Sequence, residues 1–237
     1  MSDLERDILN RLSTLLNHPW EVRDGRVVPD SKTVYDKQAV KLDATYLYAD
    51  MAGSTELAQS IDAEVAARVM RVYLDMAVRV IRYNEGDIRS FDGDRVMGIF
   101  VGWDKESRAA KAALGIEYWR GFLDYLLPTR LAEVKAIGWE LKHGVGIDTG
   151  EALLVRAGIR GNDDLISIGR APNIAAKLSG LREGYSLYAT DDAYYGMDTE
   201  TSYEDDEYNQ PRWTWLGERD FGGRKVTVYG SNYGWEC

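Results

Sequence analysis

Two aspartates in this chain occupy positions from which they could bind metal ions together. Asp50 ends the run "KLDATYLYAD", whose alternating side chains are typical of a β-strand. Asp94 lies in "FDGDRV", between two short strand-like runs that predict a hairpin. If the strand pairs with the hairpin, both carboxylates lie at one end of a sheet. Adjacent carboxylates repel one another but bind Mg²⁺ or Mn²⁺ well. Two such ions would activate a ribose hydroxyl and stabilise a leaving pyrophosphate.

The residues after Asp50 predict an anion site beside these metals. In "MAGST" the chain turns through Gly53, and Ser54 is the candidate N-cap of a helix. Backbone N–H groups at a helix N-terminus attract anions, so a triphosphate is expected to bind here.

A later helix carries polar side chains that could contact the same ligand. In "IGRAPNIAAKLSGL", Asn173 and Lys177 are four residues apart and share one helix face, so an amide and an ammonium project together. Taken alone, this pair is more typical of a surface helix end than of a ligand site.

The elements that position these residues follow the order of an α+β fold. A strand over 41–50 precedes a long helix from Ser54, and the hairpin "DIRSF"/"RVMGIFVG" precedes a second helix that Pro128 ends. "WELKHGVGID" and "EALLVRAGI" predict another hairpin around "TG". A strand, the helix with Pro172 in its first turn, and three closing strands then follow. This order predicts a ferredoxin-like antiparallel sheet with helices on one face.

The expected domain organisation is simple. Residues 1–40 form an N-terminal extension, with an amphipathic helix over 4–18 and then a connector. Residues 41–230 form the catalytic domain, and residues 231–237 form a tail.

Composition narrows the classes of function. The 237 residues are 45% apolar, which permits a core, and the net charge of −10 opposes binding to nucleic acid. The single cysteine, Cys237, excludes an internal disulfide, and only His18 and His143 could supply imidazole, so any metal site must consist of oxygen ligands. No signal peptide or membrane span is recognisable, and a cytoplasmic protein is expected.

Four motifs resemble the catalytic domain of the class III nucleotidyl cyclases. They are "YLYADMAGSTELA", "FDGDRVMGIF", "GVGIDTGEALL" and "IGRAPNIAAKLSGL", and they lie within residues 42–190 in the order and spacing of that family. The resemblance implies that Asp50 and Asp94 hold two divalent ions with help from the Met51 carbonyl. It also implies a head-to-tail homodimer, in which the metal aspartates of one protomer meet the Asn173 helix of its partner.

The resemblance assigns roles to further residues. Asn173 would orient the ribose, and Lys177 would balance charge on the transferring phosphoryl group. Lys177 stands where the family usually has Arg, so the charge is retained but the fork geometry is lost. Basic residues for the triphosphate are expected at Arg160, Arg224 and Lys225.

The base pocket departs from the family pattern. Adenylate cyclases carry Lys four residues before the second metal aspartate and Asp or Thr seven residues before the asparagine, and guanylate cyclases carry Glu and Cys. The corresponding residues here are Ser90 and Ile166. Tyr46 is expected to line the base pocket and Tyr48 to lie in the core. A small, aromatic-walled pocket favours a pyrimidine over a purine.

A compact cyclase with this departure resembles the pyrimidine cyclases of antiphage Pycsar systems. That resemblance implies synthesis of 3′,5′-cyclic UMP from UTP as a second messenger that activates a separate effector. Three alternatives stay open: a cytidylate cyclase that makes cyclic CMP, a purine (adenylate) cyclase with an atypical pocket, and a nucleotide sensor without activity.

Overall fold

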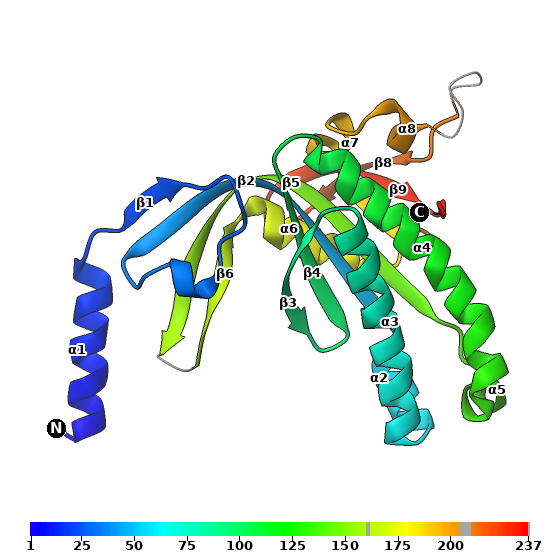
Figure 1. Cartoon of the computed structure of the whole chain (residues 1–237), viewed down its shortest axis with the longest axis horizontal. Helices are drawn as coiled ribbons and strands as arrows, with labels where there is room; N and C mark the ends of the chain where they lie inside the picture. The colour runs from blue at the N-terminus through cyan, green and yellow to red at the C-terminus, as the bar shows by residue number, and fades with distance from the viewer. Residues whose placement is uncertain (160–161, 204–209, 237) are drawn as a thin grey trace.

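A single twisted sheet forms the centre of the computed structural model, which describes residues 1–159, 162–203 and 210–236. Its strand order is β3-β4-β2-β5-β7-β9-β8; β1 pairs with β2, and β6 pairs with β5 (Figure 1). The β1–β2 and β5–β7 pairs are parallel and the other pairs are antiparallel. The strands are β1 (Glu21–Asp24), β2 (Gln38–Ala52), β3 (Asp87–Asp92), β4 (Arg95–Val101), β5 (Lys142–Ile159), β6 (Asn162–Gly169), β7 (Leu187–Thr190), β8 (Thr214–Asp220) and β9 (Lys225–Ser231).

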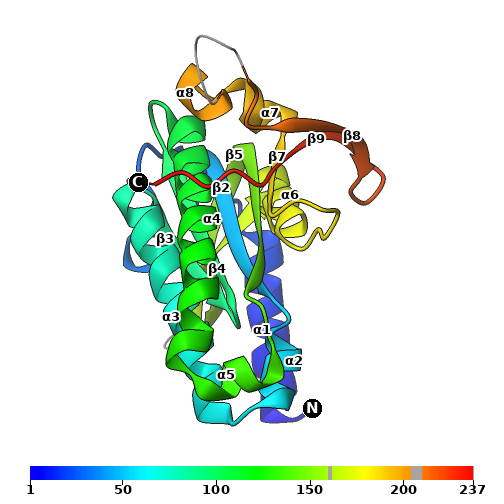
Figure 2. The same cartoon turned by 90° about the vertical axis from the view of Figure 1, so that its right-hand side faces the viewer.

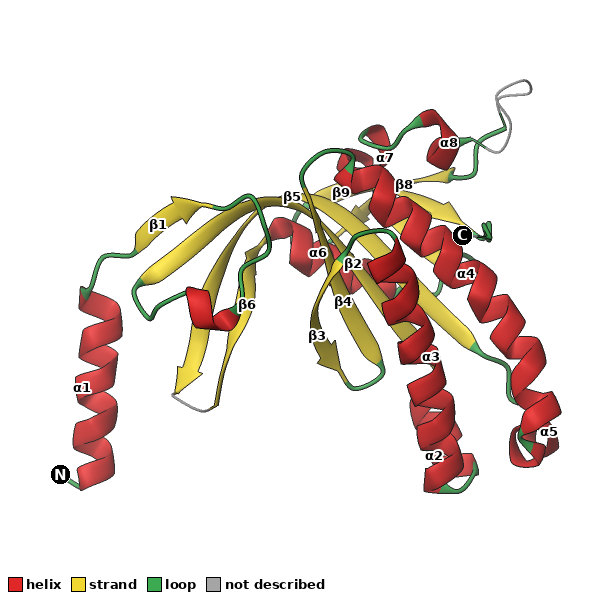
Figure 3. Cartoon of the chain, in the orientation of Figure 1, coloured by secondary structure: helices red, strands yellow, loops and turns green. Residues whose placement is uncertain are grey.

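Helices connect the strands and cover the sheet (Figure 3). They are α1 (Asp3–Asn17), the 3₁₀ helix η1 (Ser31–Thr33), α2 (Ser54–Ser60), α3 (Ala63–Tyr83), α4 (Lys105–Arg130), α5 (Ala132–Ile137), α6 (Arg170–Ser179), α7 (Asp191–Tyr195) and α8 (Thr199–Ser202). The expected α+β class is confirmed.

The two faces of the sheet carry different helices, which corrects the expectation of helices on one face only. Leu47 and Ala49 of β2 pack in one cluster with residues of α3 and α4, and these two helices lie side by side (Figure 2). Tyr46 points to the opposite face, where it packs with Ala171 and Ala175 of α6. We call this second face the α6 face. Because side chains alternate along a strand, Tyr48 and Asp50 share the α6 face with Tyr46.

Gly146 allows α6 to approach the sheet closely. A Cβ built on Gly146 would lie 2.1 Å from the carbonyl oxygen of Ala175. Only glycine leaves room for the helix backbone at this strand position. The glycine therefore sets the distance between α6 and β5.

The predicted hairpin around "TG" is wrong, because β5 is one continuous strand. Thr149 pairs with Thr45 and Gly150 pairs with Ala44 of β2, so the ladder passes through both residues without a turn. Pairing with β2 along this whole stretch overrides the local turn preference of the dipeptide.

Three other boundaries differ from the predictions. The helix expected from Ser54 is divided at Ile61 and Asp62 into α2 and α3, and Gly53 rather than Ser54 is its N-cap. Gly53 has φ 74°, a left-handed conformation in which glycine is unstrained. Pro128 does not end α4 but lies inside its last turn, two residues before the helix ends at Arg130. The expected connector contains β1 and η1.

The expected N-terminal helix is confirmed as α1, which stands away from the sheet (Figure 1). The side chain of Ser2 caps it in a capping box with Glu5, and none of its residues is buried. Within the described residues, no helix has the length and apolar character that a membrane crossing needs.

Candidate active site

The ends of β2 and of the β3–β4 hairpin bring Asp50 and Asp94 together. Asp50 pairs with Arg95 in the β2–β4 ladder, one residue beyond Asp94. The Met51 N–H donates to the Asp94 carbonyl oxygen at 3.3 Å, so the turn lies against the end of β2. Two carboxylates from distant parts of the sequence therefore meet at one sheet end.

The environment of Asp50 is that of a partly buried anion near a second anion. Burial raises the pKa of the Asp50 carboxyl, and the nearby Asp94 carboxylate raises it further. Arg182, from the loop after α6, acts in the opposite direction: its Nη2 donates to Asp50 Oδ2 at 3.3 Å. The like charges make the pair unfavourable unless a cation binds between them.

These donors fit hard divalent cations. Asp50 and Asp94 supply carboxylate oxygens, the Met51 backbone supplies a carbonyl, and Mg²⁺ typically takes one or two carboxylates with water and substrate phosphates. In the part of the chain that the structure describes, no cluster of three or more His, Cys, Asp or Glu side chains could hold a metal by itself. A metal at Asp50 and Asp94 would therefore need oxygens from a ligand.

A buried polar chain lies on the other face of the sheet behind the two aspartates. His143 lies opposite Met51 in the β2–β5 ladder. Its Nδ1 accepts a hydrogen bond from the Tyr73 hydroxyl at 3.3 Å, and its Nε2 donates to Glu117 at 2.6 Å. Burial lowers the pKa of His143, so the ring is neutral. Hydrogen bonds from His143 and Arg120 outweigh burial and hold the pKa of Glu117 at about 2. The chain fixes β5 against α3 and α4 behind the site.

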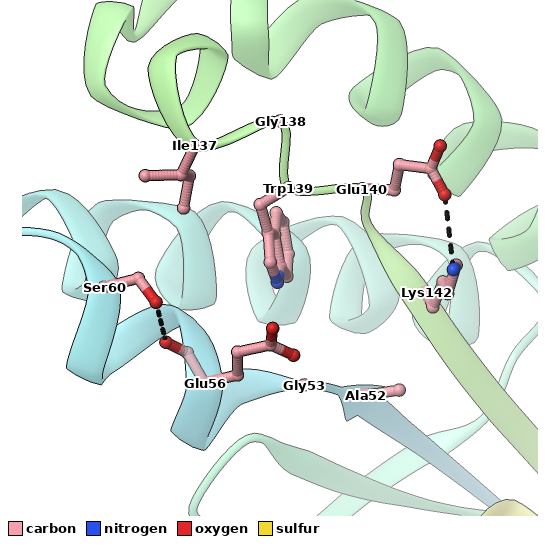
Figure 4. Close-up of a pocket in the computed structure, with 9 residues that line it drawn as sticks. All are labelled: Ala52, Gly53, Glu56, Ser60, Ile137, Gly138, Trp139, Glu140 and Lys142. Carbon is pink, nitrogen blue, oxygen red and sulfur yellow. Dashed lines mark hydrogen bonds and ion pairs between the residues drawn. The ribbon is translucent and has the colours of Figure 1, made fainter.

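A pocket of about 280 Å³ opens beyond the end of β2, between α2 and the residues after α5 (Figure 4). Trp139 and Glu56 line it beside Gly53, and the exposed Glu140 and Lys142 form an ion pair of 3.3 Å at its edge. Two carboxylates in the lining make the pocket unfavourable for an anion. Lys142 is the one cation in this lining, and the expected triphosphate site at "MAGST" stays a prediction.

Asn173 and Lys177 lie exposed on α6 and are held there by the buried residues between them. Ile174, Ala175 and Leu178 are buried, so the helix can turn its polar side chains only to solvent. A Cβ built on Gly222 would lie 3.7 Å from Lys177 Nζ, which places this ammonium against the β8–β9 turn.

The same β8–β9 turn carries the basic residues expected to contact the triphosphate. Arg224 and Lys225 are both exposed, and Lys225 pairs with Glu218 at 3.2 Å. The structure thus brings Lys177 to the turn that holds this pair. Arg160, the third expected residue, lies outside the described residues, as does Cys237.

The two halves of the expected site are not joined within one chain. Among the described residues, no hydrogen bond or ion pair links Asp50 or Asp94 to Asn173 or Lys177. The described contacts therefore do not connect the four side chains into one group.

A salt-bridge network fixes the first turn of α6. Arg170 Nη2 donates to Asp148 Oδ1 at 3.1 Å and to the Thr149 carbonyl at 2.8 Å, and it pairs with Asp192 at 2.5 Å. Asp148 is fully buried on β5, and burial raises its pKa to about 6 although the Thr190 hydroxyl donates to it at 2.6 Å. The network determines where α6 begins, three residues before Asn173.

The burial of the two strand tyrosines is the reverse of the expectation. Tyr46 is fully enclosed in the core, whereas Tyr48 is only half-buried and lies under the Arg95 guanidinium, 5.4 Å from its ring centroid. Burial raises the pKa of Tyr46 to about 12. Its hydroxyl and that of Ser167 are both buried, and the neighbouring Ser167 side chain partly offsets the rise in the pKa of Tyr46. The alternation of side chains along the strand could not predict which tyrosine is more deeply buried, because both point to the α6 face.

Ser90 and Ile166 lie on different strands and are not enclosed. Ser90 is half-buried on β3 beside a register shift, and Ile166 on β6 is 45% exposed. Their neighbours Arg89 and Asp164 form an ion pair that joins β3 to β6. In the single chain these positions form an open surface between the two strands.

Sequence analysis missed Arg182, Arg170 and Asp148. Arg182 lies in "SGLREG", which has no recognisable motif, and its contact spans 132 residues. Asp148 follows four residues of alternating glycine and apolar side chains in "GVGID", and a charged residue inside a predicted strand is a usable signal for a buried ion pair.

Solved structures with a similar fold include nucleotidyl cyclases. A bacterial light-regulated adenylyl cyclase superposes with a TM-score of 0.69 at 19% identity, over 85% of this chain and 54% of that one. The adenylyl cyclase CyaB from P. aeruginosa superposes with a TM-score of 0.64 at 23% identity, over 81% and 94%. No family model matches the chain. The fold is that of the class III nucleotidyl cyclases.

Curated relatives are similar over nearly the whole chain. A uridylate cyclase from Rhodovulum sp. (strain MB263) is 39% identical over 233 residues, which cover 96% of this chain and 95% of that protein. A uridylate cyclase from Xanthomonas perforans is 34% identical over 223 residues, which cover 93% of each. This chain belongs to the same family as these uridylate cyclases and is a nucleotidyl cyclase.

Proposed function

We propose that the protein is a uridylate cyclase, which converts UTP to 3′,5′-cyclic UMP and pyrophosphate. The observation that carries the proposal is the meeting of Asp50 and Asp94 at the end of β2, in a chain whose relatives are uridylate cyclases. The two carboxylates repel each other when no cation is bound, and all the ligand atoms they offer are oxygens. Such a pair suits a divalent ion that also binds the phosphates of the substrate.

In the proposed reaction the ribose 3′-oxygen forms a bond to the α-phosphorus, and the bond from that phosphorus to the β-bridging oxygen breaks. The hydroxyl proton is released to water, and pyrophosphate leaves. Two Mn²⁺ or Mg²⁺ ions, when bound, would activate the hydroxyl and neutralise the leaving group. Asp50, Asp94 and the Met51 carbonyl would hold them.

The residues of α6 and the β8–β9 turn complete the site in this proposal. Asn173 orients the ribose, and Lys177 balances the charge that develops on the phosphoryl oxygens. Arg224 and Lys225, on the turn that Lys177 contacts, hold the β- and γ-phosphates, and Arg160 remains a candidate for the same role. Catalysis is then mostly positioning and charge stabilisation.

The proposed site is composite, with metal carboxylates from one protomer and α6 from its partner in a head-to-tail homodimer. The exposure of Asn173 and Lys177 supports this arrangement, as does the lack of a hydrogen bond or ion pair between them and Asp50 or Asp94 among the described residues. Residues 1–40 are then an extension to a catalytic domain at 41–230, with 231–237 as a tail.

The proposed base site takes uracil. Tyr46 fills the space beneath it, and the enclosed hydroxyls of Tyr46 and Ser167 supply polar groups at the α6 face. Ser90 and Ile166 offer no charged pair for a purine. Selection for a small base then follows from the volume that Tyr46 occupies.

We also propose that cyclic UMP serves as a cytoplasmic second messenger in defence against phage and activates a separate effector protein. This role is tested by measuring cyclic UMP in bacteria that express the chain, before and after infection. A level that does not rise on infection would contradict it without affecting the assigned reaction.

The reaction is tested with purified protein, Mn²⁺ and each of the four nucleoside triphosphates in separate assays. Cyclic product and pyrophosphate from UTP are expected to exceed those from CTP, ATP and GTP. Preferred turnover of CTP would identify a cytidylate cyclase, and turnover of ATP alone would identify a purine cyclase. Tight binding without pyrophosphate release would identify a sensor.

A further inference from the structure

Arg182 connects the end of α6 to Asp50. Its Nη1 donates to the carbonyl oxygens of Ser179 and Leu181, each at 2.7 Å, while Nη2 donates to Asp50 Oδ2 at 3.3 Å. Ser179 is the last residue of α6, where helix carbonyls lack intrahelical partners, and Leu181 lies just beyond the helix. One half of the guanidinium is thus firmly anchored, and the other half makes a longer, weaker contact with the carboxylate.

The strand opposite Asp50 has no side chain where the arginine passes. Gly144 pairs with Asp50 in the β2–β5 ladder. A Cβ built on Gly144 would lie 2.5 Å from Arg182 Nη1 and 2.2 Å from the Ser179 carbonyl oxygen. Any other residue at 144 would displace the guanidinium from this path, so the contact depends on this glycine.

The contact uses an oxygen that a metal ion would need. Asp50 is close enough to Asp94 to be repelled by it, and Arg182 is the cation that donates a hydrogen bond to Asp50 among the described residues. A guanidinium at Oδ2 and a divalent ion at the same oxygen repel each other because both are positively charged. The Arg182 side chain is 41% exposed, so it can leave Asp50 without leaving the protein surface.

We propose that Arg182 is the resident counter-ion of the metal-free site, which stabilises the paired carboxylates and must leave Asp50 Oδ2 before a divalent ion binds there. The proposal rests on the metal-binding half of the proposed function. It makes Arg182 a residue that sets metal affinity rather than one that contacts the reacting atoms.

The test is Mn²⁺ binding by nucleotide-free protein, followed by the loss of the free-Mn²⁺ electron paramagnetic resonance signal. Arg182→Gln removes the competing charge, so its dissociation constant for Mn²⁺ is expected to fall roughly twofold to fivefold, the scale of a partly exposed ion pair. Arg182→Lys retains the charge, but its single nitrogen replaces the two with which the guanidinium reaches the carbonyls and Asp50 separately. It is expected to bind Mn²⁺ with an affinity between those of the wild type and the Gln variant.

Lys142→Gln is the matched control. Lys142 lies at the same end of the β2–β5 ladder, opposite Ala52, but it is 72% exposed and pairs with Glu140. This variant removes one positive charge from the same region without touching Asp50. Its Mn²⁺ affinity is expected to equal that of the wild type.

The results separate this inference from the proposed function. The role of Arg182 would be overturned if Arg182→Gln bound Mn²⁺ no more tightly than the wild type, or if Lys142→Gln tightened binding equally. Neither result would contradict the proposed cyclase activity of the wild type. If neither the wild type nor Arg182→Gln binds Mn²⁺, the inference and the metal assignment both fail. If circular dichroism shows that Arg182→Gln does not fold, the Arg182→Lys variant is used instead. If Arg182→Lys then binds Mn²⁺ no more tightly than the wild type, the proposal is overturned.

Discussion

Asp50 and Asp94 are the residues on which the proposed chemistry depends, and Asp50→Asn and Asp94→Asn test them singly. Each variant should lose at least about a hundredfold in kcat with UTP and Mn²⁺, because one ligand of the cations is gone. The metal-free variants should melt no lower than the wild type, because the repulsion between the carboxylates is removed. Steady-state rates and thermal melting measure these two effects.

Asp92→Asn is a control for both variants. Asp92 is in the same hairpin as Asp94, and its substitution also removes one negative charge. The Asp92 side chain, however, is 78% exposed and pairs with Arg95 at 2.7 Å. Its kcat should stay within about threefold of the wild type, since exposed ion pairs contribute little. Full activity in Asp50→Asn or Asp94→Asn would remove that residue from the metal site.

Asp148 gives a prediction about pH. Its pKa is about 6 in the folded protein, above the ordinary value of 3.8, so the folded state binds the proton more tightly. The contribution of this group to the free energy of unfolding is greatest below pH 3.8 and falls by up to about 3 kcal/mol as the pH rises through 6. Urea unfolding at pH 5 and pH 7.5 should show this slope in the wild type. The slope should be smaller in Asp148→Asn, and an unchanged slope would assign it to other groups.

At the scale of elements, the packing of α6 on β5 depends on glycine. Gly146→Ala would place a methyl group 2.1 Å from the Ala175 carbonyl, so the free energy of unfolding should fall by more than about 2 kcal/mol. Gly121→Ala is the matched control: Gly121 lies inside α4, and its added methyl would meet nothing within 4 Å. That change should stabilise the protein by about 0.5–1 kcal/mol. Denaturant titration measures both, and equal effects would contradict the close approach of α6.

Local signals in the sequence were enough to predict the elements that carry Asp50 and Asp94. Period-two alternation placed the first strand, and "DGD" between two short runs placed the hairpin. The same kind of signal failed at "TG", because β2 pairs with both sides of the dipeptide and keeps β5 extended. Pairing partners lie far away in sequence, so a local pattern cannot show them.

The contacts of α6 were beyond sequence analysis for a related reason. Asn173 and Lys177 could be placed on one helix face from their spacing alone. The contact of Arg182 with Asp50 could not be predicted, since it depends on the bare backbone of Gly144 on a strand between them. Similarly, Tyr46 and Tyr48 point to the same face, and only the position of α6 decides which of them is enclosed.

In the proposed dimer, the two halves of each active site lie on different chains. Asp50→Asn has an intact α6, and Lys177→Ala has intact metal carboxylates. In a head-to-tail dimer of one variant with the other, one of the two sites then contains every required side chain. The exposed Asn173 and Lys177 lead to this expectation, because among the described residues neither makes a hydrogen bond or ion pair with Asp50 or Asp94.

The measurement that tests this account most directly is cyclic UMP formed from UTP and Mn²⁺ by an equimolar mixture of Asp50→Asn and Lys177→Ala, after the subunits have exchanged. Random pairing makes half of the dimers mixed with one intact site each, so the mixture should reach about a quarter of the wild-type rate while each variant alone is inactive. A mixture as inactive as its components, under conditions where the wild type makes cyclic UMP and the subunits exchange, would contradict the composite site.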